Sequence, residues 1–347
     1  MTGVGIILSI LAFSLLIVSH EFGHFIVAKK CGVYVEEFSI GFGPSLISWK
    51  GEETRYSIKL IPFGGSCAML GEDESMADER AFTSKNVFQR MAILFAGPLF
   101  NFILAFILSI IVIGAMGVDE PVLSEVMEGY PAQEAGMQAG DRITKLNDEN
   151  IHVYRDVSLY IALHQGENLD VVYERDGQKY ETVIVPKYSE EYQSYMMGIV
   201  VNGTRTRLGV LGTLKYSAFE VGYWIRYTFT SLKMLIRGRV GLQDMSGPVG
   251  MVSSMTDMVK ESSQDGLFYI FINLANICIL LSANLGVMNL LPIPALDGGR
   301  LLFCLIELVR GKPVDQEKEA AVHTVGILLL FALMFVIMFK DIWQIFG

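Results

Sequence analysis

The sequence predicts a polytopic α-helical membrane protein with four transmembrane helices, a membrane-associated β-hairpin region and one inserted extracytoplasmic β domain. The 347 residues are 52% hydrophobic, with a mean hydropathy of +0.42, which is too apolar for an ordinary soluble protein. Four apolar windows are long enough to cross a bilayer, and they cover Val4–Ala28, Met91–Val118, Leu267–Leu291 and Val322–Phe339. A polar stretch, residues 119–207, lies between the second and third windows and has room for one small water-soluble domain.

The basic residues near the ends of the windows predict the orientation of the chain. They gather in the loop between the first two windows and in the loop between the last two: Lys29, Lys30, Arg80, Lys85 and Arg90, then Arg300, Arg310, Lys312 and Lys318. Because cytoplasmic loops carry an excess of Lys and Arg, we expect both loops to face the cytoplasm. Both termini and the soluble domain then face the outside.

Charge and cysteine content narrow the possible partners. The net charge of −10 argues against nucleic acid as a partner. The four cysteines lie in or next to apolar segments and form no CxxC pair, so they predict neither a disulfide framework nor a zinc ribbon. We expect Cys31, Cys67, Cys278 and Cys304 to be packing residues.

The first apolar window contains His20-Glu21-Phe22-Gly23-His24. On a helix, histidines four residues apart project from one face, so both imidazoles can bind one zinc ion. Glu21 lies beside them and can take a proton from a water molecule that the metal activates. The rest of Val4–Ala28 carries no charged side chain, and an ionisable cluster inside a membrane span indicates a functional site. A signal peptide is the alternative, but the window lacks a basic start and a small-residue cleavage site.

A hydrolytic zinc site usually has three protein ligands and one open position. Asp297, in the stretch Asn289–Arg300 just past the third window, is the best third candidate because apolar residues and glycines surround it. The alternative is an Asp in a turn, since Asp-Gly is a turn signal by itself. With four spans, Asp297 emerges on the cytoplasmic side, which is also the side nearer to His20 and His24.

The segment Leu208–Arg237 could be read as a fifth span. Its basic residues Lys215, Arg226, Lys233 and Arg237 fall within about 40° of one another on a helix, which favours an amphipathic helix lying in the membrane interface. A fifth span would also put Asp297 on the opposite side of the membrane from His20. The interfacial interpretation is therefore preferred.

Two regions are expected to be β structure. Residues 34–69 alternate like two strands around a turn at Lys50-Gly51. In the soluble stretch, Leu169–Tyr173 and Tyr180–Val185 alternate on either side of Asp176-Gly177, a typical hairpin turn.

An HExxH in the first span, a late Leu296-Asp297-Gly298 and a soluble insert between them resemble the site-2 protease family, zinc metalloproteases that cut transmembrane substrates within the bilayer. Within that family the chain looks like the bacterial RseP/RasP type, which cleaves membrane-bound anti-sigma factors. The likeness covers essentially the whole chain and includes Gly41–Pro44, Gly97–Asn101 and Ser246–Gly250. The stretch Tyr130–Ile143 resembles part of a bacterial PDZ domain, and only one such domain fits, whereas some relatives carry two.

This resemblance implies four parts of the chain. They are a first half of the membrane core at 1–118, a PDZ-like domain at 119–204, interfacial helices at 205–265 and a second half of the core at 266–347. It also implies residue roles: His20, His24 and Asp297 on one zinc ion, Glu21 as the catalytic base, and Asn284, Asn289 and Pro292 in substrate binding. For the two asparagines, hydrogen bonding between helices is the alternative. Asn101 is expected to be structural, and His323 an ordinary surface or interfacial residue.

The implied function is hydrolysis of a peptide bond within the transmembrane segment of a single-span protein in the bacterial inner membrane. An anti-sigma factor, trimmed beforehand by another protease, is the expected substrate, and the lipid bilayer is the other partner. The PDZ-like domain would exclude intact ectodomains. Two alternatives remain, an inactive scaffold that binds membrane helices and a metal transporter. Glu21 argues against both because neither needs a base, and no inverted repeat supports transport.

Overall fold

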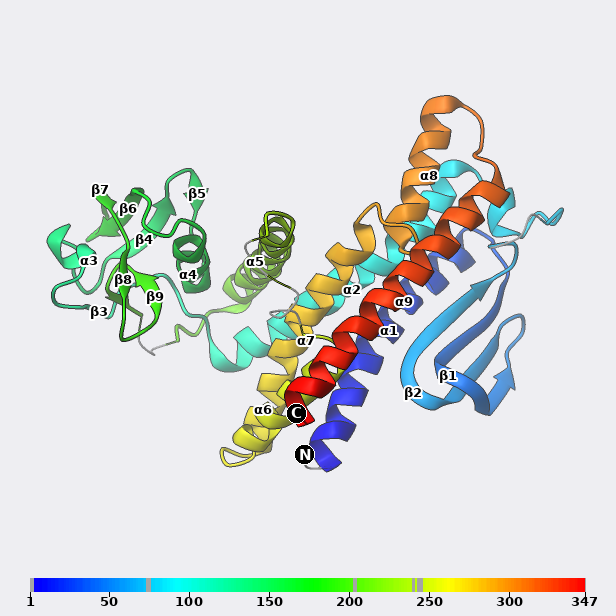
Figure 1. Cartoon of the computed structure of the whole chain (residues 1–347), viewed down its shortest axis with the longest axis horizontal. Coiled ribbons are helices and arrows are strands. Elements are labelled where there is room, and N and C mark those ends of the chain that lie inside the picture. Colours follow the sequence, from blue (N-terminus) through cyan, green and yellow to red (C-terminus); the bar gives the residue numbers. More distant parts are fainter. Residues whose placement is uncertain (1–2, 73–75, 202–204, 239–240, 242–245, 347) are drawn as a thin grey trace. The chain divides into compact units, whose positions relative to one another are not determined.

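The computed structural model describes residues 3–72, 76–201, 205–238, 241 and 246–346. The chain forms two compact units. The first comprises Met1–Leu108 and Thr228–Gly347, and the second comprises Ser109–Tyr227. We describe each unit by itself (Figure 1). The predicted boundary at residue 204 falls outside the described residues, and the four-part division stays a prediction.

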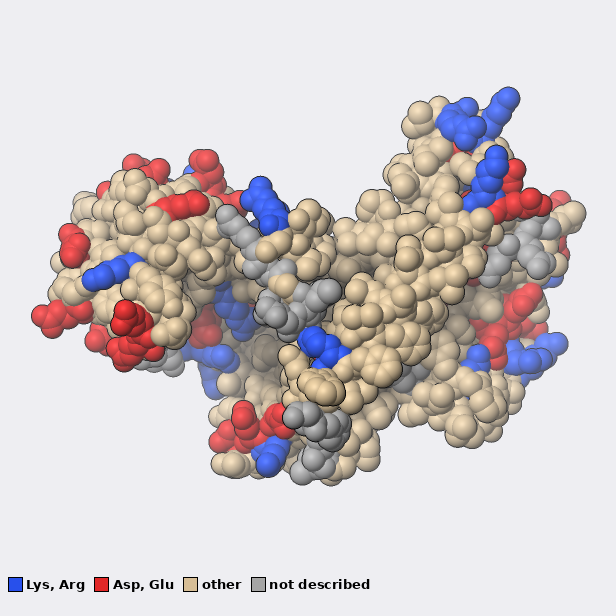
Figure 2. All heavy atoms as spheres, viewed as in Figure 1, with Lys and Arg blue, Asp and Glu red and all other residues tan. Residues whose placement is uncertain are grey.

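Four helices of the described chain are long and apolar enough to cross a membrane, as predicted: α1 (Gly3–Lys30), α2 (Val87–Met116), α7 (Leu267–Leu290) and α9 (Gln316–Phe346). In Figure 2 the charged side chains gather on the β-rich unit and near helix ends, whereas the middles of the long helices show mainly other residues. The helix α5 (Val210–Ile236) is not among the four. Its place in the membrane interface stays a prediction.

The predicted hairpin is confirmed and is more elaborate than expected. Strand β1 (Val35–Lys50) pairs with β2 (Arg55–Met69) around a turn in which the Gly51 N–H donates to the Thr54 carbonyl at 2.9 Å. Residues 37–40 of β1 pair twice, with residues 65–68 and with residues 55–58 of β2, while residues 45–50 pair with residues 55–59. Strand β1 must therefore bend. It bends at Gly41, where φ is +87° and a Cβ would lie 2.4 Å from the Ile61 carbonyl oxygen.

The sheet of β1 and β2 packs against α1, and its far end is apolar and open. Leu46, Ile47, Trp49, Leu60 and Ile61 are all exposed. Large exposed apolar side chains on one hairpin are unusual in water and suit contact with lipid.

Shorter elements complete the first unit: the 3₁₀ turn η1 (Phe82–Ser84), α6 (Pro248–Ser262) and α8 (Asp297–Arg310). Two ion pairs tie α8 to its surroundings, Arg90 to Glu307 at 2.6 Å and Arg300 to Glu72 at 2.5 Å. A buried cluster that includes Ala28, Val35 and Ile93 joins α1, the sheet and α2.

The second unit contains the expected β domain. A sheet in the order β5-β4-β6-β7 is accompanied by the pairs β3–β10 and β8–β9. The strands are β3 (Glu125–Val126), β4 (Arg142–Leu146), β5 (Glu149–Asn150), β6 (Leu169–Arg175), β7 (Gln178–Ile184), β8 (Lys187–Ser189), β9 (Ser194–Met196) and β10 (Ile199–Val200), with helices α3 (Pro131–Glu134) and α4 (Tyr154–Leu163). The predicted hairpin at Asp176-Gly177 is confirmed, since both residues have positive φ and Arg175 pairs with Gln178.

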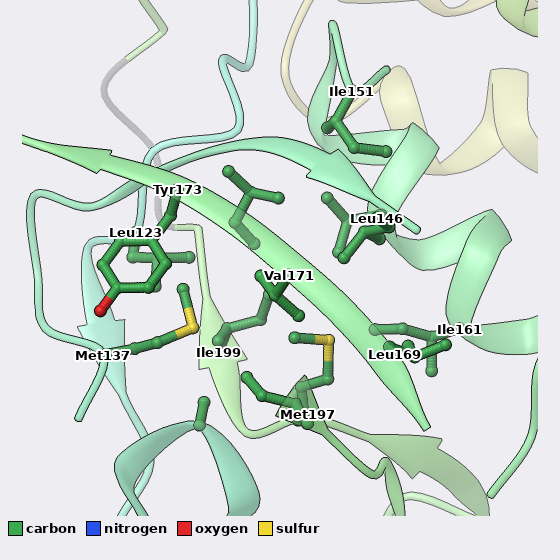
Figure 3. Packing of buried hydrophobic residues seen from close by; sticks show 14 residues of the cluster. Leu123, Met137, Leu146, Ile151, Ile161, Leu169, Val171, Tyr173, Met197 and Ile199 are labelled. Carbon is green, nitrogen blue, oxygen red and sulfur yellow. The ribbon is translucent and has the colours of Figure 1, made fainter. Parts of the chain in front are cut away.

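The core of this unit includes alternate residues of β6. Leu169, Val171 and Tyr173 are at most 5% exposed. Figure 3 shows Val171, Leu169 and Met197 in the same cluster. Period-two burial on one face is what the alternation in the sequence predicted.

Ion pairs hold the first part of α5 within the second unit. Arg226 of α5 lies 2.5 Å from Asp156, and Tyr216 donates to Glu120 at 2.7 Å. Burial alone would raise the pKa of Glu120, but hydrogen bonds from Tyr216 and Arg142 hold that pKa below its usual value. Arg226, one of the four basic residues on the face of the predicted interfacial helix, is therefore paired with Asp156.

Candidate metal centre

The structure brings the two predicted histidines and the predicted aspartate together. His20 Nε2 lies 3.2 Å from His24 Nε2, and Asp297 Oδ2 lies 3.2 Å from the first and 3.4 Å from the second. Both histidines come from α1, where residues four apart share a face, and both are buried. Asp297 comes from the first turn of α8. The Asp-Gly sequence thus begins a helix whose first carboxylate faces the histidines.

The donor set fits zinc. Ligand atoms at about 2.0–2.1 Å from a tetrahedral zinc lie about 3.3 Å from one another, close to the three distances just given. Asp297 Oδ2 is buried and accepts no hydrogen bond in the described part of the chain. A buried carboxylate oxygen without a donor is costly, and a cation held by all three ligand atoms removes that cost. Two histidines and a carboxylate are a common zinc ligand set.

A hydrogen bond at His24 Nδ1 leaves Nε2 of the same ring free to bind a metal ion. His24 Nδ1 lies 2.8 Å from the carbonyl oxygen of Ile93 in α2. A carbonyl only accepts, so Nδ1 carries the proton and donates it. Nε2 then has its lone pair available and points toward His20 and Asp297, the arrangement found in most histidine metal ligands.

Asn101 in α2 does the same for His20. Its amide lies 3.1 Å from His20 Nδ1, with Nδ2 facing the ring and Oδ1 buried without a hydrogen-bond partner among the described residues. With the amide reversed, Oδ1 accepts from Nδ1–H, and His20 Nε2 is left free for metal. The reversed orientation pairs Oδ1 with the Nδ1–H group and leaves Nε2 for the metal, so we assign it. The backbone of Asn101 is itself held, because Ser282 of α7 donates to its carbonyl at 2.7 Å.

Two glycines make room for this packing. A Cβ on Gly97 of α2 would lie 2.3 Å from His24 Nε2 and 2.8 Å from His20 Cε1. A Cβ on Gly23 of α1 would lie 2.3 Å from the carbonyl oxygen of Ala96. Gly23 is therefore a helix-packing glycine, and Gly97 leaves the space that the imidazoles occupy.

Glu21 lies between the histidines and the sheet. It is half-buried, and a Cβ on Gly65 of β2 would lie 3.5 Å from Glu21 Cγ. Strand β2 thus approaches α1 at the residue that was predicted to be the base.

The three predicted substrate-binding residues are near the end of α7. Asn284 Oδ1 accepts a hydrogen bond from Thr228 of α5, so at least one of its polar atoms is used between helices. Asn289 is half-buried, and Pro292 is exposed in the loop that follows α7. Their roles in substrate binding stay a prediction.

Comparison with known proteins then decides the family. The family model described as peptidase family M50 matches residues 8–333. The chain belongs to peptidase family M50. It is 33% identical to the zinc metalloprotease RasP of Geobacillus kaustophilus, with 98% of each chain covered. It is 30% identical to the regulator of sigma-W protease RasP of Bacillus subtilis, with 98% of this chain and 99% of that protein covered.

Among solved structures, the PDZ domain of an SdrC-like protein from Listeria monocytogenes overlaps 24% of this chain and 87% of its own length. The identity is 19% and the TM-score is 0.22.

Membership of the M50 family confirms the resemblance to the site-2 proteases. The protein is a zinc metalloprotease with several membrane-spanning helices. Zinc would be held by His20, His24 and Asp297, whose spacing and donor atoms suit it.

Two residues near this M50 centre have contacts that the sequence did not specify. Asn101 was expected to be structural, bonding between helices, and it does join α2 to α1, through the ring of His20. His323 was expected to be an ordinary surface or interfacial residue, yet it is 8% exposed and accepts a hydrogen bond from the backbone of Ala295. A polar residue inside an apolar window was the only available signal for either, and it does not say what the side chain touches.

Proposed function

We propose that this M50 protein hydrolyses a peptide bond inside the transmembrane segment of a single-span membrane protein, using one zinc ion. One observation carries the proposal: two ligands of the candidate centre lie on α1, a helix that is apolar and long enough to span a membrane. A protease centre at that place can reach a peptide bond that ordinary soluble proteases cannot.

The residues divide the chemistry between them. Zinc, when bound, polarises the scissile carbonyl and makes a water molecule acidic enough to react near neutral pH. Glu21 takes the proton from that water as it attacks the carbonyl carbon. Glu21 then gives the proton to the leaving amine as the C–N bond breaks. His20, His24 and Asp297 hold the metal and keep the reacting groups aligned.

A helical substrate must also be unwound, because its backbone carbonyls are hydrogen-bonded within the helix. Strand β2 offers a means. Among the described residues, residues 65–68 have a strand partner on one side, which is residues 37–40. An extended substrate segment can pair with the other side, which would hold it beside Glu21, since Gly65 approaches Glu21. Asn284, Asn289 and Pro292 are proposed to hold the same segment from α7 and its following loop.

The finer points of substrate and orientation rest on likeness and charge. The Bacillus subtilis relative is named for regulation of sigma-W, which supports an anti-sigma factor, trimmed beforehand, as the substrate here. The basic residues of the two loops support a cytoplasmic position for these loops and an extracytoplasmic position for the β domain in the bacterial inner membrane. There a PDZ-like domain would admit trimmed substrates and exclude intact ectodomains.

The test uses purified full-length protein in detergent with a model single-span substrate. Wild type and Glu21→Gln are compared for bound zinc and for cleavage. Glu21→Gln keeps the three ligands, so we expect about one zinc ion per chain in both proteins and cleavage by the wild type alone.

Each other outcome contradicts a named part of the proposal. Cleavage by Glu21→Gln would remove Glu21 as the base. A wild type that binds zinc yet cuts no membrane substrate would favour a scaffold or a transporter.

A further inference from the structure

The loop between α7 and α8 carries Asp297 and has an unusual backbone. Residues 291–296 contain a tight turn in which the Ile293 N–H donates to the Leu291 carbonyl at 2.7 Å. Ala295 has a φ of +83°, a left-handed conformation that non-glycine residues seldom adopt. Such a conformation persists only where its surroundings hold it. Because Asp297 follows two residues later, whatever holds Ala295 also sets where the carboxylate points.

The last helix, α9, supplies that support. His323 Nδ1 accepts a hydrogen bond from the Ala295 N–H at 2.9 Å. The His323 side chain is buried, and its ring lies 5.8 Å from that of Phe303 in α8. An imidazole that accepts at Nδ1 is neutral, and it satisfies a backbone donor that would otherwise be buried in an apolar region.

A second contact on α9 lies one turn further along. A Cβ on Gly326 would lie 2.5 Å from Pro294 Cβ and 2.6 Å from the Pro294 carbonyl oxygen. The backbone of α9 therefore rests directly against the residue before Ala295. His323 and Gly326 are three apart and share one helix face, so α9 holds two consecutive loop residues with one face.

The loop also presses against α8 from the other side. A Cβ on Gly298 would lie 2.1 Å from the Leu291 carbonyl oxygen, and one on Gly299 would lie 2.5 Å from the Ile293 carbonyl oxygen. The loop thus has no space to relax toward α8. If the contact at Ala295 is lost, the movement has to pass to Leu296 and Asp297.

We propose that His323 is a positioning residue for the metal centre: from α9 it fixes Ala295, and through Ala295 it holds Asp297 Oδ2 against His20 and His24. This inference rests on the proposed role of Asp297 as a ligand. It makes the last span part of the catalytic framework rather than a membrane anchor. His323 does not touch the metal, so its loss should weaken zinc binding without abolishing it.

The experiment measures zinc affinity by competition with a chelator in the full-length protein in detergent, for wild type, His323→Leu and His323→Asn. Supporting partners of a metal ligand contribute about 10- to 100-fold to metal affinity. We expect His323→Leu to bind zinc at least about tenfold more weakly. His323→Asn, whose amide oxygen can accept from Ala295, should recover most of that loss. Thr324→Val is the matched control, because the Thr324 hydroxyl donates to the Ala320 carbonyl within α9 at 2.9 Å.

Kinetics separate positioning from general damage. With saturating zinc, His323→Leu should lower kcat and leave the KM for the model substrate unchanged, because the substrate surfaces are intact. Gly326→Ala, which pushes Pro294 by a different contact, should weaken zinc binding in the same way even if His323→Leu folds poorly. Wild-type zinc affinity in both His323→Leu and Gly326→Ala would overturn the inference. A wild type that binds zinc but does not cut would instead contradict the proposed function. The zinc affinities of wild type and variants could still be compared in that case.

Discussion

The metal centre in the first unit and the core of the second unit are both buried, but they are specified in opposite ways. In the second unit, apolar side chains such as Ile143 and Leu169 fill one face of a sheet, and neighbours of similar shape could replace them. In the first unit, polar atoms of His20, His24 and Asp297 meet within 4.8 Å of one another. They depend on particular hydrogen-bond partners and on the absence of a Cβ at Gly97. The metal centre therefore tolerates amino-acid substitution much less than the core of the second unit does.

Substitutions in the two regions should therefore be detected by different measurements. Changes at the centre should alter zinc binding and leave the folding of the second unit intact. Changes in the second core should lower stability and leave the zinc ligands in place. Substitutions at four positions test this separation, and they are given in order of decreasing expected effect.

Asp297→Asn should have the largest effect. It replaces the charged ligand with a neutral amide, so zinc affinity should fall by more than about 100-fold and cleavage should be lost. Metal analysis after dialysis against a chelator measures the first effect, and a gel assay measures the second. Unchanged zinc content would remove Asp297 from the ligand set, whereas altered protease resistance of the second unit would break the proposed separation.

Leu169→Ala tests the core of the second unit. Leu169 is fully buried in the second unit, so its truncation should destabilise that unit by about 2–5 kcal/mol. Urea unfolding followed by proteolysis of the β domain reports the loss, and zinc content should equal that of the wild type. Val183→Ala, at a side chain that is 57% exposed, is the control and should change stability by less than about 0.5 kcal/mol. Loss of zinc in Leu169→Ala would mean that the two regions are not independent.

Gly97→Ala should weaken zinc binding less than the loss of a ligand does and more than a conservative change does. The new Cβ would overlap the imidazoles of His20 and His24, so zinc affinity should fall by roughly 10-fold or more. Gly114→Ala on the same helix is the control, because its Cβ would meet its nearest neighbour, Thr213 Cγ2, only at 4.0 Å. Equal zinc affinity in the two variants would show that Gly97 is not needed for the space around the ligands.

Asn101→Asp compared with Asn101→Leu should give the smallest effect and the sharpest information. Leu removes the acceptor for His20 Nδ1–H, so zinc affinity should fall by about tenfold. Asp keeps an acceptor oxygen at the same place and should bind zinc nearly as the wild type does. The opposite order would mean that Asn101 donates to His20, contrary to the amide orientation assigned here.

Features that depend on short-range periodicity could be predicted from the sequence. Apolar windows of membrane length predicted the four spanning helices, because each helix satisfies its own backbone hydrogen bonds in lipid. The four-residue spacing of His20 and His24 placed both on one face for the same local reason. Alternation around Asp176-Gly177 and around Lys50-Gly51 predicted two hairpins. Asp297 could be predicted as a ligand because a zinc hydrolase needs a third ligand and few carboxylates lie next to a span.

The tertiary structure was needed to show which residues, distant in sequence, contact the metal ligands and shape the hairpin. The double pairing of β1 residues 37–40 depends on a bend at Gly41 that alternation does not reveal. Asn101, Gly97 and His323 lie on α2 and α9, and nothing in their own neighbourhoods tells which ligand they serve. The physical reason is that a polar group buried in an apolar core must find a partner, but the sequence states only that a partner is needed. The packing of α1, α2, α8 and α9 determines which residue that partner is.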